Sequence, residues 1–183
     1  MKKIFQIALL LVVSFTAYAT DSAPSNSEAV KLIDGYNEVL VAANESSIHE
    51  QANSSFRVLW LRSFHEPVIF SLSKSNETNV IITKVLDGLG GYEKGKLKSV
   101  NSNEVAERHV SYIYQTLAKT CRFYELAVQQ PPVSMDGSTI VIELNIDGTY
   151  HAVQTQSMRS NECINKIAKL VVVLSGVVFE RVY

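Results

Sequence analysis

The segment Gly90–Lys96 has the spacing of a phosphate-binding loop, G-x-x-x-x-G-K. In such a loop the glycine-rich backbone surrounds phosphate groups, and a following Ser or Thr ligates magnesium at the start of a helix. Leu97 stands where that hydroxyl belongs, and the first residues with helix-capping character, Asn101–Asn103, come too late to meet a phosphate. The pattern therefore predicts a loop and not a nucleotide site.

Ser71 and Lys74 have the S-x-x-K spacing of the nucleophile in penicillin-binding enzymes. That chemistry needs serine and lysine one helical turn apart, so that the amine reaches the hydroxyl. The surrounding residues 68–73 alternate in the manner of a half-buried strand, in which positions i and i+3 point to opposite faces. Neither S-D-N nor K-T-G follows downstream. We interpret the match as coincidental.

His65 and Glu66 begin like the zinc motif H-E-x-x-H, but Ile69 stands where the second ligand should be. The histidines are His49, His65, His109 and His151. Because they are scattered, they form no local metal motif, and we expect neither a metal nor a cofactor. Arg62, His65 and Glu66 are expected to form an ion-paired corner at the end of a strand.

Acid–base catalysis gives one functional hypothesis, an envelope hydrolase. His65 or His151 would be the general base, and Glu143 or Asp136 would be its carboxylate partner. The hypothesis requires a histidine within about 4 Å of a carboxylate inside a concave pocket.

The elements that position these residues follow from hydrophobic periodicity. We expect a single α+β domain with one antiparallel sheet of about four to six strands and flanking helices. Residues 20–55 are expected to form an N-terminal helix (27–43) and a linker, and residues 56–183 the α+β domain. Predicted strands lie at 56–62, 68–73, 80–86, 138–145 and 149–155.

Two further helices are predicted in the second half. Asn101 and Glu104 resemble a capping box ahead of a helix that runs to about Lys119. Its inward stripe is predicted to comprise Val105, His109, Tyr112, Ile113 and Leu117. The last helix is predicted over 160–175, with Gly176 ending it.

The first nineteen residues have the order of a secretory signal peptide. A basic start at Lys2 and Lys3 precedes an apolar run, and Ala17-Tyr18-Ala19 is an A-x-A cleavage site. We expect cleavage after Ala19 and a periplasmic or secreted mature protein. The apolar run is shorter than the ~20 residues of a membrane helix, and no second long apolar run follows.

The two cysteines, Cys121 and Cys163, are expected to form a disulfide in that oxidising destination. The bond would close a loop of about 43 residues and stabilise the fold by roughly 4 kcal/mol on the chain-entropy model. Two separately buried thiols are the alternative. Loss of the signal changes the formal net charge from −1 to −3, which does not favour a nucleic-acid partner or an anionic membrane surface.

Several segments resemble a group of small uncharacterised exported bacterial proteins. They are Val58–Pro67, Leu86–Leu97, Asp136–Ser138 and Gly148–His151. The resemblance covers roughly residues 56–176. It implies that these segments converge around one sheet in a bacterial envelope protein, and it implies no activity.

The leading functional hypothesis is a non-enzymatic periplasmic binding protein, such as an immunity-type inhibitor of a toxin delivered there. Its partner would be another envelope protein or a toxin. Trp60, Arg62, Tyr92 and Tyr150 would be the anchors if they are exposed, and His65, Glu143 and His151 complete the candidate set. A third hypothesis is a structural module of an envelope assembly, with Val177–Phe179 as an exposed apolar patch.

Overall fold

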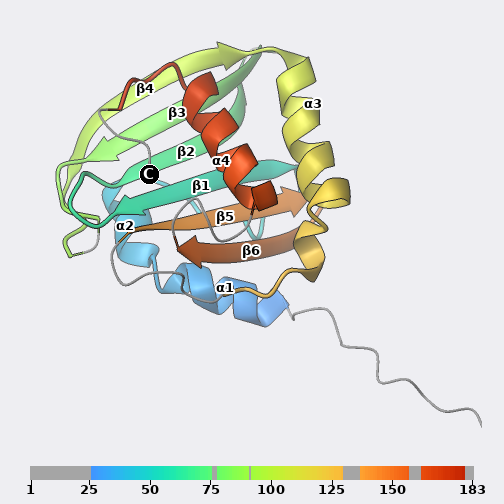
Figure 1. The fold of residues 1–183 in the computed structure, drawn as a ribbon, viewed down its shortest axis with the longest axis horizontal. Coiled ribbons are helices and arrows are strands. Elements are labelled where there is room, and N and C mark those ends of the chain that lie inside the picture. The colour runs from blue at the N-terminus through green and yellow to red at the C-terminus, as the bar shows by residue number, and fades with distance from the viewer. Residues whose placement is uncertain (1–25, 76–77, 91, 130–136, 157–161, 180–183) are drawn as a thin grey trace, which may run out of the picture.

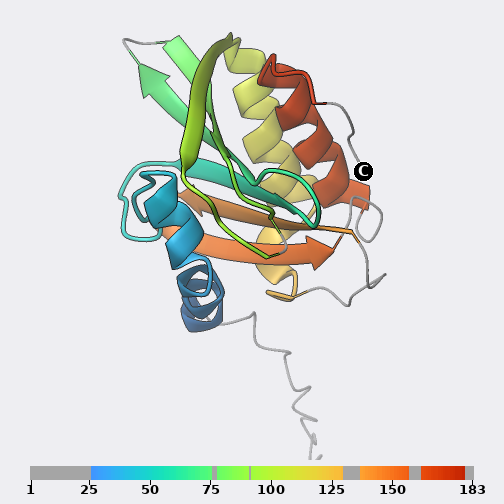
Figure 2. The ribbon, with the colours of Figure 1, turned by 90° about the vertical axis from the view of Figure 1, so that its left-hand side faces the viewer.

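The computed structural model describes residues 26–75, 78–90, 92–129, 137–156 and 162–179. The predicted signal peptide, its cleavage site and Asp136 lie outside these residues. The described residues form one six-stranded antiparallel sheet with helices on both faces (Figures 1 and 2). The predicted α+β class and the single antiparallel sheet are therefore confirmed.

The sheet is built from hairpins around a central strand, β1. The strands are β1 (Ser55–Arg62), β2 (Val68–Ser75), β3 (Thr78–Leu86), β4 (Leu97–Val105), β5 (Ser138–Ile146) and β6 (Thr149–Gln156). Their order is β4-β3-β2-β1-β5-β6. Since β1 lies in the interior of the sheet with helices on both faces, every one of its residues is buried, which explains its nearly continuous apolar sequence.

One face of the sheet packs against the two helices of the second half, α3 (Glu107–Gln115) and α4 (Glu162–Leu174), as Figure 2 shows. A π-helical segment, Thr116–Thr120, continues α3. The larger hydrophobic core lies here and includes Phe56, Val58, Trp60, Phe70, Ile113, Leu117, Phe123, Ile140, Ile142, Ile164, Ile167 and Val171. The prediction that Tyr112 points inward is wrong, because its side chain is 55% exposed.

The opposite face packs against two short helices, α1 (Asn26–Asp34) and α2 (Asn37–Ala42). The single helix predicted over 27–43 is thus broken at a turn formed by Gly35 and Tyr36. Gly35 is a poor helix former, and the break lets both helices turn apolar side chains toward the sheet. Their core includes Leu32, Ile33, Leu40, Leu59, Ile69, Val141 and Tyr150.

Strand β4 replaces the predicted start of a helix. Asn101 and Glu104 do not form a capping box, because both lie in β4 opposite Thr83 and Val80. Helix α3 begins only at Glu107, after Ala106 in an extended conformation. The pairing of β4 with β3 determines its conformation, since its polar sequence carries little strand signal of its own.

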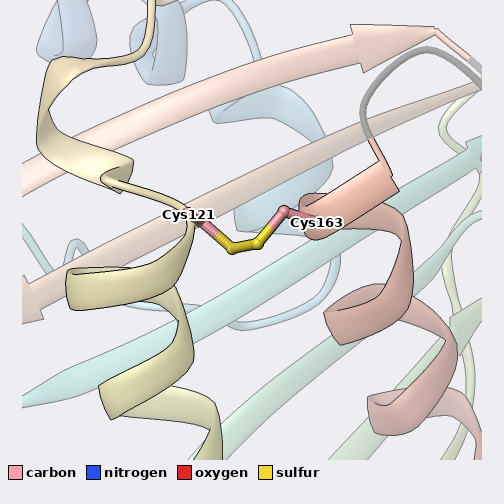
Figure 3. The surroundings of a disulfide bond; sticks show 2 residues. All are labelled: Cys121 and Cys163. Atoms are coloured by element: carbon pink, nitrogen blue, oxygen red, sulfur yellow. A yellow bond between two sulfur atoms is a disulfide. The ribbon is translucent and has the colours of Figure 1, made fainter.

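Cys121 and Cys163 form a disulfide, with 5.6 Å between their Cα atoms (Figure 3). Cys121 directly follows the π-helical segment, and Cys163 lies in the first turn of α4. The bond joins these two elements on the same face of the sheet. The predicted pairing is confirmed.

Candidate interaction surface

Two connections lie together at one end of the sheet: residues 63–67 between β1 and β2, and residues 87–96 between β3 and β4. They meet because Val68, at the start of β2, pairs with Val85 near the end of β3. The backbone N–H of Gly90 donates to the carbonyl oxygen of His65 at 2.9 Å. This hydrogen bond joins two of the segments that the sequence resemblance singled out.

Glycines hold the second connection tightly against the first. A Cβ atom at Gly90 would lie 2.6 Å from the backbone nitrogen of Arg62, a separation that no side chain tolerates. Gly95 has φ +70°, and a Cβ atom there would lie closer still to the backbone nitrogen of Gly88. Because backbone packs directly on backbone, this loop is compact and is positioned by the end of β1.

The two connections present an exposed apolar group, here called the Phe64 surface, which consists of Phe64, Leu89 and Tyr92. The exposed fractions are 64% for Phe64, 71% for Tyr92 and 44% for Leu89. The Phe64 and Tyr92 rings lie 6.0 Å apart between centroids, at 38°. Two large rings thus contact each other in solvent on a backbone that is well packed.

Charged groups surround the Phe64 surface. Lys94 Nζ lies 2.6 Å from Glu38 Oε2, and Lys98 forms an ion pair with Glu66. The hydrogen bond with Lys94 lowers the pKa of the Glu38 carboxyl. A shallow hollow of about 540 Å³ runs from Tyr92 along residues 93–96. An aromatic centre with a polar, hydrated rim is the usual anatomy of a protein–protein contact.

A second cluster of polar side chains is buried beneath α2. Arg57 Nε lies 2.6 Å from Glu143 Oε2, and both side chains are fully buried. Tyr150 Oη donates to the other oxygen of Glu143 at 2.9 Å. Glu45 completes the cluster, at 3.2 Å from Arg57 Nη1 and 2.7 Å from Lys84 Nζ.

Electrostatics in this cluster favours a structural role. Burial alone would lower the pKa of Arg57, but the carboxylates of Glu143 and Glu45 outweigh it and raise that pKa. Burial, together with the Glu143 carboxylate, raises the pKa of Tyr150. The guanidinium and the phenol therefore stay protonated and donate to Glu143, both of whose oxygens accept hydrogen bonds.

His151 lies on the other face of the sheet from Glu143. In the β5–β6 register Glu143 is opposite Ala152, whereas His151 is opposite Leu144, and successive residues of a strand face opposite sides. His151 Nε2 is 2.9 Å from the Leu126 carbonyl oxygen, and its ring packs edge-on against Phe123. Burial lowers the pKa of His151. The Glu143–His151 pair of the hydrolase hypothesis therefore does not form.

Trp60 and Arg62 belong to the interior. Trp60 is 1% exposed and Arg62 is 5% exposed. The Arg62 guanidinium carbon lies 4.7 Å from the Trp60 ring centroid and 5.3 Å from that of Phe179. Because Tyr150 is also buried, Tyr92 alone among the four predicted anchors meets the condition of exposure.

The expected ion-paired corner takes a different form. Arg62 Nε and Nη2 donate to the backbone carbonyl oxygen of Glu66, at 3.2 and 3.0 Å, while the Glu66 carboxylate contacts Lys98. His65 lies between them in the turn and is half-buried. Hydrogen bonds to a backbone carbonyl oxygen, as well as an ion pair, therefore stabilise this corner.

The remaining motifs have structural explanations. Gly90–Lys96 precedes strand β4 and no helix, which agrees with its interpretation as a loop. Ser71 lies in strand β2, and its hydroxyl donates to Glu45 at 2.9 Å. Among the described residues, no three His, Cys, Asp or Glu side chains are grouped as metal ligands.

Sequence reasoning did not single out Phe64 and Leu89 as binding residues. A signal was present at both positions. Phe64 is a large apolar residue in a turn, between the buried strand β1 and Pro67. Leu89 stands between Gly88 and Gly90, where a tight turn exposes its side chain. Apolar residues at turn positions with no core to face indicate a contact surface.

Fold and surface together define a disulfide-bonded α+β protein with an exposed aromatic group at one end of its sheet. A scan against protein-family models found no match, and a search among curated proteins returned no significant relative. No helix of the described residues has the length and apolar character needed to cross a bilayer. The disulfide is consistent with an oxidising compartment.

Proposed function

We propose that this chain is a non-enzymatic binding protein of the bacterial cell envelope, and that the Phe64 surface is where a partner protein docks. The observation that carries the proposal is the exposed Phe64–Tyr92 ring pair on a glycine-packed loop. Exposed rings in contact with one another are costly to keep in water, and contiguous apolar groups of this kind mark interaction sites.

The rigidity of the loop supports the same proposal. Binding is weakened when side chains and loops must be ordered on contact, and a preformed surface avoids much of that cost. Gly90 and Gly95 fix the backbone that carries Leu89 and Tyr92, and the hydrogen bond from Gly90 to His65 fixes it relative to the turn of Phe64. Aromatic side chains in such positions commonly supply most of the binding energy.

The chemistry of the surface describes its partner. The partner would offer an apolar recess for the Phe64 and Tyr92 rings, with polar groups around it that meet Lys94, Glu93 and Lys96. We propose the periplasm as the compartment, reached through the predicted signal peptide and cleavage after Ala19. An inhibitor of the immunity type, acting on a toxin or another envelope protein, is the function that fits these properties best.

Site-specific photo-cross-linking in cells tests the proposal. A photoreactive phenylalanine analogue replaces Tyr92 in one variant and Tyr112 in a control variant. Tyr112 is comparably exposed but lies on α3, away from the Phe64 surface. We expect a discrete protein adduct from position 92 that is absent from position 112 and is lost when Phe64→Ser is added. Identical adducts at both positions, or none at position 92, would overturn the proposal.

A further inference from the structure

The two edges of the sheet differ in how they are covered. At the β6 edge, the N–H of Gln154 donates to the Val128 carbonyl oxygen at 2.7 Å, and Gln129 forms a parallel bridge with Gln154. Helix α1 also packs against β6. At the other edge, β4 forms the outer margin of the sheet (Figure 1).

Strand β4 is exposed over most of its length, and on one face Asn103 Nδ2 donates to the Leu174 carbonyl oxygen at the end of α4, at 2.8 Å. Five consecutive residues, 100–104, are all exposed, and so is Lys98. Every second residue of an edge strand directs its N–H and C=O groups away from the sheet, which makes such an edge a template for another strand. Proteins usually block long edges with proline, with charge or with a bulge. In β4 the only charged residues are Lys98 and Glu104, and the one irregularity in its pairing with β3 is at the start of the strand, beside Lys98. The segment between these two residues therefore has none of these blocking features.

We propose that β4 pairs with β4 of a second copy of this chain, which joins two six-stranded sheets into one continuous antiparallel sheet. Two identical antiparallel strands are related by a two-fold axis perpendicular to the sheet, so each residue contact occurs twice. With the axis at Asn101, Lys98 stands opposite Glu104 of the second copy, and Glu104 stands opposite Lys98.

Charge complementarity selects this register. It pairs the whole segment 98–104, between the irregularity at the start of β4 and the beginning of α3. Opposite charges directly across a strand pair are stabilising, and no like charges meet. Glu104 is exposed and forms no ion pair within the described residues, and Lys98 remains exposed beside Glu66. The occupant that these charges fit is therefore β4 itself.

The dimer is expected to be weak. A single pair of strands buries less surface than the ~1,200–2,000 Å² of a standard stable interface, so the dimer should form in the micromolar to millimolar range. The Phe64 surface lies on the connections 63–67 and 87–96, outside the paired segment. Lys98 also belongs to the rim of that surface through its ion pair with Glu66, so Glu104→Lys is the single reversal that leaves the Phe64 surface unchanged.

Sedimentation velocity of the purified protein between about 1 µM and 1 mM tests the proposal, with three variants: Lys98→Glu, Glu104→Lys and the two combined. Each single reversal places like charges opposite each other twice, and should raise the dimer dissociation constant at least tenfold. The combined variant restores both pairs and should return the constant to within about threefold of the wild-type value. Thermal unfolding of each variant shows whether its fold is retained.

The remaining outcomes would overturn the proposal. These are a wild-type protein that stays monomeric at 1 mM, a dimer that neither single reversal weakens, and single reversals that weaken it without rescue by the combined variant. Phe64→Ser is the control for the other surface. This variant should dimerise as the wild type does. If it does not dimerise, the interface lies at the Phe64 surface and not at β4.

Discussion

Arg57 and Glu143 stand directly opposite each other on β1 and β5, with Nε and Oε2 2.6 Å apart and neither side chain exposed. They form a buried ion pair in the interior of the sheet. Tyr150 donates to the other oxygen of Glu143, and Glu45 and the backbone carbonyl of Ser46 accept from Arg57 Nη1, the latter at 2.8 Å. Arg57 Nη2 is buried without a hydrogen-bond partner among the described residues. The pair thereby also holds the segment after α2 against the sheet.

Removing one charge of this pair should be strongly destabilising. Glu143→Gln leaves the Arg57 guanidinium buried with only Glu45 as a carboxylate partner. We expect the free energy of unfolding to fall by about 3 kcal/mol, because an uncompensated charge in the interior is costly. Urea unfolding measures the change. Glu125→Gln, which breaks the exposed Arg122–Glu125 pair, is the control and should cost less than about 1 kcal/mol.

A double variant distinguishes charge from packing. Arg57→Met with Glu143→Leu removes both charges and fills similar space, so it should recover at least half of the stability that Glu143→Gln loses. A double variant less stable than Glu143→Gln would show that the hydrogen bonds to Tyr150 and Ser46 matter more than the balance of charge.

The disulfide should contribute a large part of the stability. Replacing Cys121 and Cys163 by alanine should lower the free energy of unfolding by about 4 kcal/mol, since the bond restricts the unfolded chain over a separation of 42 residues. A reducing agent should lower the free energy of unfolding of the wild-type protein to that of the variant, and should leave the value for the variant unchanged. Equal stability of both proteins under oxidising conditions would contradict this.

Gly90→Ala should disturb the loop that carries Tyr92. The added Cβ would lie 2.6 Å from the Arg62 backbone nitrogen, so the loop must move, at an expected cost of about 2 kcal/mol. Gly148→Ala is the matched control. Gly148 has φ +85° and open space around it, so only backbone strain of about 1 kcal/mol applies there. If Gly148→Ala is the more destabilising variant in urea unfolding, the close packing at Gly90 is not what holds the loop.

His151 should make the fold sensitive to acid. Burial lowers the pKa of His151 in the folded state, while the unfolded chain keeps the ordinary value of about 6.5. Between the two pKa values the unfolded chain binds a proton that the folded chain does not, so the free energy of unfolding decreases as the pH falls below about 6.5. His151→Gln should lose less stability between pH 7.5 and pH 5 than the wild type. The same loss in both proteins would assign the acid sensitivity to other groups.

Sequence patterns predicted the fold where burial decided the structure. The apolar run of β1, the alternation in β2 and the hairpin of β5 and β6 each indicate one type of element. Strand β4 was not predictable in this way, because six of its nine residues are exposed and its pairing with β3 determines its conformation. The same polar residues, Asn101 and Glu104, gave a false capping signal.

The candidate site was only partly predictable for a related reason. Residue types identified Trp60, Arg62, Tyr92 and Tyr150 as possible anchors, but exposure depends on which layer covers each face. Trp60 and Tyr150 lie under helices, whereas Tyr92 lies at a loop tip. Glu143 and His151 are eight residues apart along the hairpin, yet the strand register places them on opposite faces. Such relationships can be predicted only when the pairing of the strands is known.

The most direct measurement of the central claim is the affinity for the partner identified by cross-linking at position 92. Isothermal titration would compare the wild type with Phe64→Ala, Tyr92→Ala and the control Tyr112→Ala. Truncating an aromatic residue at the centre of an interface costs about 2 kcal/mol or more, roughly a thirtyfold loss of affinity. We predict that loss for Phe64→Ala and Tyr92→Ala, with Tyr112→Ala within about twofold of the wild type. Equal affinities for all four proteins would contradict the assignment of the Phe64 surface as the binding site.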